Sequence, residues 1–78
     1  MTTSVVDASA IGVEVVEGFL RVTLRDGRVL ATPLSWFPRL ADATPAQLTD
    51  WRLIGRGEGI HWSSLDEDVS VAGLLRTN

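Results

Sequence analysis

Two glycine-containing dipeptides, each set between alternating apolar stretches, constrain the first half of this chain more than any other feature. Glu17-Gly18 separates IGVEVV from FLRVTL, and Asp26-Gly27 separates FLRVTL from RVLATPL. Asp-Gly between such stretches is a strong hairpin signal, because both positions of a tight two-residue turn need positive φ. Glu17-Gly18 is a weaker signal of the same kind. The pattern predicts a three-stranded antiparallel meander.

The two turns predict strand registers that agree with each other. Two-residue turns place Val22 opposite both Val13 and Ala31, and Leu24 opposite both Ile11 and Val29. One face of the meander then holds eight apolar residues: Ile11, Val13, Val15, Leu20, Val22, Leu24, Val29 and Ala31. A register slip by one residue would scatter this set between the two faces, so the agreement supports the meander.

The opposite face of the predicted meander is more polar. It holds Glu14, Phe19, Arg21, Thr23, Arg25, Arg28, Leu30 and Thr32. Glu14 falls opposite Arg21, a cross-strand pair that contributes about 0.2–1 kcal/mol. Arg25 falls opposite Arg28, which is unfavourable unless an anion binds there. We interpret this face as solvated, and contact with an anion or an acidic partner is the alternative.

After Pro33 the pattern predicts short helices and two more strands. SWFPRL, residues 35–40, suits a turn or one short helical segment. In TPAQ, Thr44 as N-cap, Pro45 at the first helical position and Gln47 at the third form a capping-box signature. WRLIG and IHW predict strands joined by a loop over residues 55–59. A short terminal helix follows Ser70 as N-cap, with Val71, Leu74 and Leu75 docking on the sheet.

These elements predict an α+β fold in one small domain, residues 1–78. Its antiparallel sheet consists of the three-stranded N-terminal meander and a C-terminal hairpin, with short helices on one face. Residues 1–9 form a polar lead-in, ordered or frayed.

The stretch GIHWSSLDED contains the single histidine of the chain, His61, followed by three consecutive acids. A zinc site needs several ligands converging on one point, and a calcium loop needs alternating ligands with a glycine at its tight turn. Neither pattern is present, so we expect no metal and no cofactor. The acids precede the terminal helix, where negative charge is favourable, and Asp66 or Asp68 can cap a turn over residues 66–69. We expect His61 to be a hydrogen-bonded scaffold residue.

Composition excludes several function classes. The chain has no cysteine, no lysine and a net charge of −3. It therefore lacks disulfides, thiolate chemistry and Schiff-base chemistry, and we predict that it is not an enzyme. Its acidic balance argues against direct nucleic-acid binding, which needs several cations together. We find no signal peptide or membrane span and predict a cytoplasmic location.

Three tryptophans are many for 78 residues. Trp36, Trp51 and Trp62 can each complete a thin core. For Trp36 the alternative is an exposed interface anchor beside Arg39, because tryptophan and arginine are typical of binding hot spots.

Three segments resemble a known bacterial family. DGRVLATPLSWFPRL, ATPAQ and WRLIGRGEGIHWSSLDEDVSVAGLL together resemble the Domain of Unknown Function 2442 family, over roughly Val13 to Leu75. The most specific portion is GIHW…LDED.SV.GLL. The resemblance implies a small α+β protein, often encoded beside another small protein in a toxin–antitoxin-like arrangement. Some members are fused to a helix-turn-helix domain, which this chain is expected to lack. The family brings no catalytic residues.

We predict a protein-interaction module, the antitoxin-like or regulatory member of a two-protein pair. The expected partner is another small protein, and a homodimer through an edge strand is the alternative. The expected contact residues are Trp36, Arg39, Arg21, Arg25 and Arg28, with Asp66, Glu67 and Asp68 as a second patch.

Two alternatives belong to other function classes. One is a small ligand-binding or enzymatic domain in which His61 works with Asp66 or Glu67, in a pocket with Arg39 or Arg56. The other is weak nucleic-acid binding through the arginines of the sheet face, with Phe19 as the available stacking aromatic.

Overall fold

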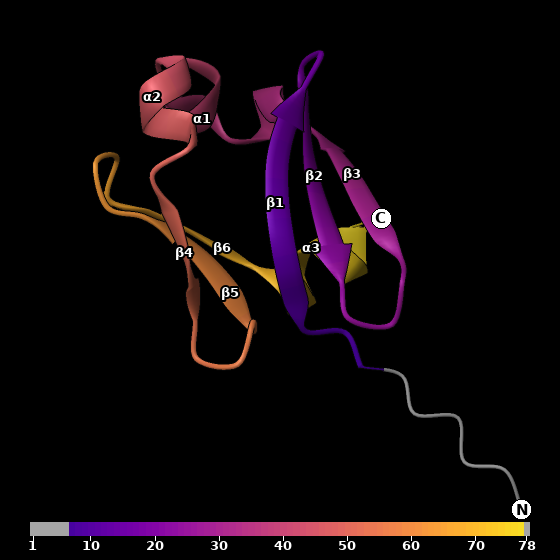
Figure 1. Ribbon diagram of the computed structural model, residues 1–78. Helices are drawn as coiled ribbons and strands as arrows, with labels where there is room; N and C mark the ends of the chain where they lie inside the picture. The colour runs from indigo at the N-terminus through magenta and orange to yellow at the C-terminus, as the bar shows by residue number, and fades with distance from the viewer. Residues whose placement is uncertain (1–6, 78) are drawn as a thin grey trace, which may run out of the picture.

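The computed structural model describes residues 7–77, which form two three-stranded antiparallel sheets and a few short helices (Figure 1). Sheet A contains β1 (Ala10–Val16), β2 (Phe19–Leu24) and β3 (Val29–Pro33). Sheet B contains β4 (Trp51–Ile54), β5 (Gly59–Trp62) and β6 (Glu67–Ser70). The helical elements are η1 (Leu34–Trp36), α1 (Pro38–Ala41), α2 (Pro45–Leu48) and α3 (Val71–Thr77). The predicted α+β class and the N-terminal meander are confirmed.

The turn between β1 and β2 has the predicted two-residue geometry. Glu17 and Gly18 have φ values of 50° and 82°, so both turn positions lie in the left-handed region. The resulting register places Val13 opposite Val22 and Glu14 opposite Arg21, as predicted.

The turn between β2 and β3 contradicts the prediction, because its loop has three residues rather than two. The amide of Leu24 donates to the carbonyl of Arg28 at 2.8 Å, and that of Gly27 donates to the carbonyl of Leu24 at 3.0 Å. Gly27 has a φ of 97°, the arrangement of a type I turn closed by a glycine bulge. A carboxylate oxygen of Asp26 accepts the Arg28 amide at 3.0 Å, which favours this turn over the tighter one.

The extra loop residue exchanges the inward and outward faces of β3. Val22 lies opposite Leu30 rather than Ala31. Thr32 is fully buried and Leu30 is half-buried, whereas Ala31 is exposed and Val29 is 44% exposed. The predicted inward positions of Val29 and Ala31, and the predicted outward positions of Leu30 and Thr32, were therefore wrong. A shift of one residue exchanges the faces of a strand.

The start of β1 also departs from the predicted register. A bulge between Ala10 and Gly12 leaves Ile11 without a partner, and Ala10 takes the place opposite Leu24. Ile11 is consequently 47% exposed, contrary to the prediction, while Ala10 is 1% exposed. The amide of Ala10 donates to the carbonyl of Gly57 at 2.8 Å, so the bulge lets β1 contact the β4–β5 turn.

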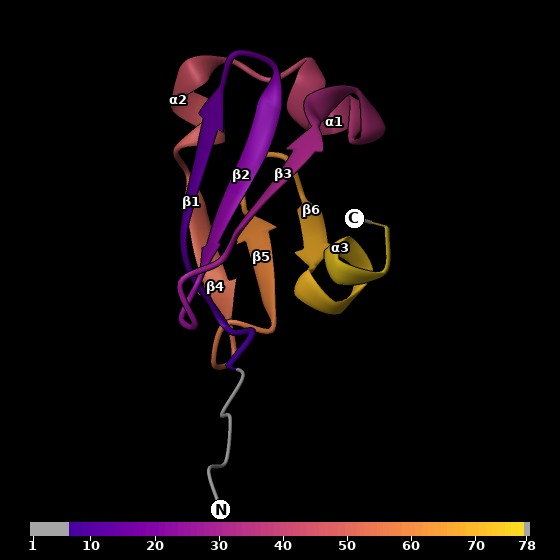
Figure 2. The same cartoon turned by 90° about the vertical axis from the view of Figure 1, so that its right-hand side faces the viewer.

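Sheet A and sheet B lie one behind the other in Figure 2, with β1 beside β4. At the other side, α3 contacts β3, β5 and β6. Residues from both sheets and two helices form one core: Ala10, Leu20, Val22, Leu24, Leu40, Ile60, Trp62, Val69, Val71 and Leu74. Trp62 is the largest fully buried side chain, and its indole N–H donates to the carbonyl of Leu48 at 3.1 Å.

Both predicted helix caps are present. The Thr44 hydroxyl accepts the Gln47 amide at 3.2 Å, and the Gln47 side chain accepts the Thr44 amide at 2.9 Å, which completes the capping box. The Ser70 hydroxyl accepts the amide of Gly73 at 3.1 Å at the start of α3.

The acidic segment forms a strand where a turn over residues 66–69 was predicted. Glu67–Ser70 is β6, and it pairs with β5 so that Val69 lies opposite Ile60. The predicted C-terminal hairpin is therefore confirmed and extended by a third strand. Val69 is buried between exposed Asp68 and exposed Ser70, which is the two-residue period of a strand. Asp66, the turn residue directly before β6, has a φ of 50°.

The beginning of the described chain lies against the β2–β3 loop. The carbonyls of Asp7 and Ser9 accept the amides of Asp26 and Arg25 at 3.1 and 2.8 Å. Residues 1–6 of the predicted lead-in lie outside the described residues.

Replacing Gly57 with alanine tests the contact between the β4–β5 turn and β1. Gly57 has a φ of 91°, and a Cβ there would meet the backbone oxygen and nitrogen of Ala10, the nitrogen at 2.8 Å. Gly18 is a matched control, since its φ is 82° and a Cβ would meet nothing within 4 Å. We expect Gly18→Ala to lower the free energy of unfolding by about 1–2 kcal/mol through backbone strain alone. Gly57→Ala should cost about 1–3 kcal/mol more through overpacking. Equal losses in urea unfolding would contradict this contact.

Candidate functional site

A hollow of about 250 Å³ lies where the segment after β3 meets β6 and α3. It is lined by Trp36, Phe37, Asp68, Val69, Ser70, Gly73 and Leu74. We call this the Trp36 hollow. It brings together Trp36 and Asp68, which the sequence placed on two separate patches.

Trp36 reaches this hollow because β3 ends in a proline. Pro33 terminates the strand, and η1 follows at once, with the Leu34 amide donating to the carbonyl of Gly18 at 2.8 Å. The Phe37 amide donates to the Leu34 carbonyl at 2.9 Å, and Phe37 packs against the core. Trp36 is left 52% exposed, so its ring does not serve to complete the core.

Asp68 enters the hollow from β6 and also contacts His61. The two residues are directly opposite each other on β6 and β5, and Nδ1 of His61 pairs with Oδ1 of Asp68. The His61 side chain is 21% exposed, whereas that of Asp68 is 67% exposed. His61 is thus a hydrogen-bonded residue on the face opposite to Ile60 and Trp62, and most of the Asp68 side chain remains exposed.

A second, shallower hollow of about 190 Å³ adjoins the first on the outer face of sheet B. It is lined by Ile54, Glu58, Gly59, Asp68, Val69 and Ser70. Asp68, Val69 and Ser70 line both hollows, so the two form a continuous surface along β6. Arg52 lies opposite His61 on the same face, which gives a row of Arg52, His61 and Asp68 across the three strands.

Arg39 supports the β5–β6 turn. Its Nη1 donates to the carbonyls of Leu65 and Asp66 at 3.2 and 3.1 Å. Asp66 is exposed in that turn, and Glu67 is half-buried opposite Trp62. The structure therefore separates the three acids, because only Asp68 lines the Trp36 hollow.

Three arginines on sheet A and its β2–β3 loop each pair with an acid. Arg21 lies 3.4 Å from Glu14, Arg25 lies 3.4 Å from Asp7 and Arg28 lies 2.9 Å from Asp26. Arg25 and Arg28 belong to the three-residue loop and its closing position, so the predicted repulsion across a tight turn was wrong. These pairs leave little uncompensated positive charge on the outer face of sheet A and on the β2–β3 loop.

The acids in two of these pairs have altered pKa values. Hydrogen bonds from the side chain and backbone of Arg28 lower the pKa of Asp26 below 3.8, and the charge of Arg28 adds to the effect. Hydrogen bonds from Ser9, with a further contribution from Arg25, lower the pKa of Asp7.

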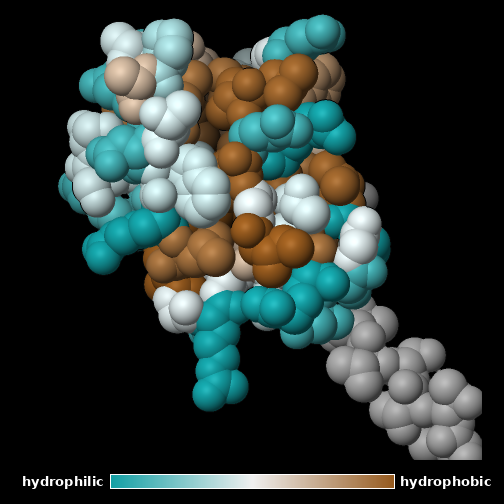
Figure 3. Space-filling view, viewed as in Figure 1, coloured by the Kyte–Doolittle hydropathy of each residue, from teal (hydrophilic) through white to brown (hydrophobic). Residues whose placement is uncertain are grey.

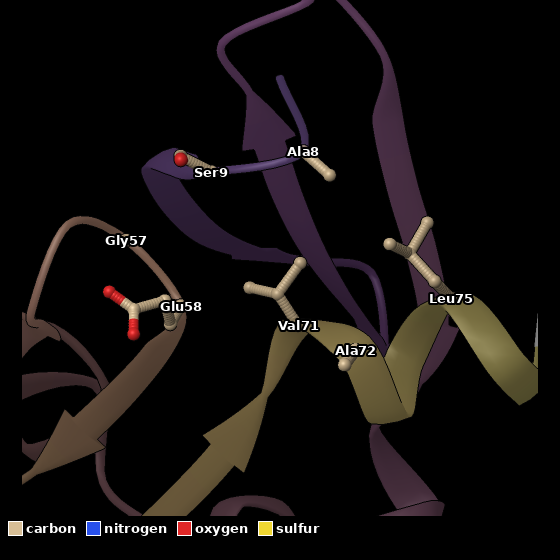
Figure 4. A pocket seen from close by; sticks show the side chains of 7 residues that line it. All are labelled: Ala8, Ser9, Gly57, Glu58, Val71, Ala72 and Leu75. Carbon is tan, nitrogen blue, oxygen red and sulfur yellow. The ribbon is translucent and has the colours of Figure 1, made fainter. Parts of the chain in front are cut away.

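Two other hollows lie on the described surface. One, of about 350 Å³, is lined by β1, α2 and β4, and apolar side chains gather between α2 and the upper part of β1 in Figure 3. The other, of about 270 Å³, is bordered by residues 8–9, the β4–β5 turn and α3 (Figure 4). Its single acid, Glu58, accepts the Arg56 amide at 2.9 Å. Both hollows offer mainly apolar walls.

The chemistry available at the site favours binding. Within residues 7–77, no three His, Asp or Glu side chains converge as a metal site requires. His61 pairs with Asp68 rather than with Asp66 or Glu67, and Arg39 is engaged by backbone carbonyls. The Trp36 hollow offers an aromatic ring, a carboxylate and a hydroxyl, which are recognition groups.

Comparison with known proteins identifies the family. Residues 10–78 match the family described as "Protein of unknown function (DUF2442)". The chain belongs to this family. The resemblance seen in the sequence is thereby confirmed for this DUF2442 member over nearly its whole length.

Two solved structures share its fold. A crystal structure of a protein of unknown function from Rhodospirillum rubrum ATCC 11170 is 30% identical, with a TM-score of 0.76, over 88% of this chain and 86% of that chain. A solution NMR structure of an uncharacterized protein from Chromobacterium violaceum is 28% identical, with a TM-score of 0.74, over 87% of this chain and 64% of that chain. No curated protein matches the chain.

No helix within the described residues of this DUF2442 chain has the length and apolar character needed to cross a membrane. The cytoplasmic location remains a prediction.

Sequence reasoning missed Ser70 and Val69 as lining residues of the site. The alternation of Glu67, Asp68, Val69 and Ser70 was the available signal, since one apolar residue sits between polar neighbours at strand period. The run of acids before an apolar stretch is equally typical of a helix start, and that interpretation concealed the strand.

Acid should remove the stability that the Asp26 carboxylate supplies. Because the folded state lowers the pKa of Asp26, this contribution is present above pH 3.8 and is lost as the pH falls through the lower folded value. We expect Asp26→Asn to have a lower urea midpoint than wild type at about pH 7 and the same midpoint at about pH 2. Arg28→Gln should make the pH dependence of the urea midpoint smaller without abolishing it, because it removes the side-chain hydrogen bond and the charge but keeps the backbone amide donor. A gap between wild type and Asp26→Asn that persists unchanged in acid would contradict the assignment.

Proposed function

We propose that this chain is a protein-interaction module that binds another small protein through the Trp36 hollow. The observation that supports this most directly is the placement of Trp36, which is 52% exposed at the rim of a hollow that also contains Asp68. An exposed indole beside a concave surface is typical of an interface anchor, because tryptophan buries a large area when a partner covers it.

The chemistry of the hollow favours a basic side chain from the partner. An arginine or lysine placed there can stack on the Trp36 ring and pair with the open part of the Asp68 carboxylate. The net charge of −3 would favour the approach of a basic partner over long range. A guanidinium fits this pair of groups best, because it is planar and stacks on aromatic rings.

Within a two-protein pair, the chain would be the antitoxin-like or regulatory member in the cytoplasm. This part of the proposal follows from the arrangement that the family resemblance implies. It also fits a site that offers contact surfaces and no nucleophile activated by a base.

Two other functions have weaker support. Nucleic-acid binding would need unpaired cations on sheet A and its β2–β3 loop, where Arg21, Arg25 and Arg28 are each paired with an acid. A small ligand-binding or enzymatic role would depend on His61 with Asp68, and the paired carboxylate would then orient the imidazole.

Affinity purification from cells of the native host, with mass spectrometry, tests the proposed function. Wild type should retain a small basic protein, and Trp36→Ala should bind it about thirtyfold more weakly, the effect of losing a hot-spot residue. Asp68→Asn should weaken retention as well. Ile11→Ala is the control, since Ile11 is 47% exposed away from the hollow. Undiminished retention by Trp36→Ala, or no retained protein at all, would refute the proposal.

A further inference from the structure

Among residues 7–77, no helix or strand covers the outer face of sheet A, and this face is unusually apolar. Figure 2 shows the three strands facing the viewer with no element in front of them. Val16, Phe19 and Val29 point outward and are 37%, 44% and 44% exposed. Only one pair of charges, Glu14 and Arg21, lies among the paired residues of this face. Strands of an antiparallel sheet with one solvated face normally place polar residues on that face. The apolar residues here instead give this face the composition of an interface.

The strand register orders this face into matched rows. Val16 lies opposite Phe19, Glu14 opposite Arg21, and Gly12 opposite Thr23 across β1 and β2. The rows are therefore apolar with apolar, acid with base, and small with polar. Because side chains alternate along each strand, all six residues share the outer face.

This order is self-complementary. A two-fold axis parallel to the strands, between β1 and β2, would place β1 of one copy over β2 of the other. Val16 would then face the second copy's Phe19, and Glu14 would face its Arg21. Gly12 would leave room for Thr23 in the third row. An interface with two-fold symmetry uses the same patch on both copies, and each contact occurs twice.

We propose that the outer face of sheet A binds a second copy of this chain, with Glu14 and Arg21 exchanging partners between the copies. In the monomer these two side chains pair at 3.4 Å and remain 62% and 44% exposed. In the dimer each is covered by an opposite charge, so burial leaves no unpaired ion. The apolar row of Val16 and Phe19, next to the charged row, supplies the driving force.

An alternative axis along β2 is disfavoured by charge. It would bring Arg21 against the Arg21 of the second copy, and Glu14 against Ala31, which lies opposite Arg21 on β3. Like charges in contact oppose association, so the Glu14–Arg21 row selects the axis between β1 and β2. This surface is separate from the Trp36 hollow, and the dimer does not depend on the proposed function.

Two variants with a reversed charge in the Glu14–Arg21 row, studied separately and as a mixture, test the dimer. Glu14→Arg places two arginines in the row, and Arg21→Glu places two glutamates there. Each variant alone should dimerise at least about tenfold more weakly than wild type in sedimentation experiments, because like charges then face each other. An equimolar mixture of the two should recover a heterodimer, since every cross-copy contact is again between opposite charges.

The mixture separates this proposal from a purely intramolecular role. Both variants lose the Glu14–Arg21 pair within the chain, and mixing cannot restore that pair. The double variant Glu14→Arg/Arg21→Glu should dimerise like wild type. Phe19→Asp should abolish the dimer, while Ile54→Asp, on sheet B, should not. A wild-type chain that stays monomeric at high concentration, or variants that dimerise equally and gain nothing on mixing, would overturn the proposal.

Discussion

The burial of Trp62 is the interaction on which the arrangement of the second half of the chain depends. Its side chain is fully buried, and its indole N–H donates to the carbonyl of Leu48 at the end of α2. This joins sheet B to the helical connection as well as to the core. Because β5 alternates, burying Trp62 and Ile60 obliges His61 to lie on the outer face, beside Asp68. The position of the candidate site thus follows from the packing of its neighbours.

The two sheets present outer faces of different character. Sheet B has polar groups along β6 and joins the Trp36 hollow, which suits an unlike partner with a basic side chain. Sheet A has an apolar face divided by one ion pair, which suits a second copy. A dimer through sheet A would leave both Trp36 hollows available, so the two associations are compatible. A small chain has little core to stabilise it, and both contacts would add to its stability.

Sequence patterns predicted the local features in which backbone conformation and side-chain chemistry agree. Glu17-Gly18, the weaker turn signal, forms the tight turn, and Thr44 and Gln47 form the capping box. Asp26-Gly27, the stronger signal, forms a longer loop. There the Asp26 carboxylate accepts the Arg28 amide, a side-chain hydrogen bond that the dipeptide preference does not include. That bond favours the three-residue loop, and the loop length sets the register of β3.

The sequence by itself determined the antiparallel meander, both helix caps and the opposite orientations of His61 and Trp62, because these depend on neighbours within a few residues. It also marked Trp36 as a candidate anchor. Only the tertiary structure decided that Asp66–Asp68 leads into a strand, that Asp68 and Trp36 line one hollow, and that the bulge exposes Ile11. These depend on contacts between segments distant in the chain, such as Ala10 with Gly57 and β6 with β5. The free energy of such contacts outweighs local preference, and the local pattern before Val69 fits a helix start as well as a strand.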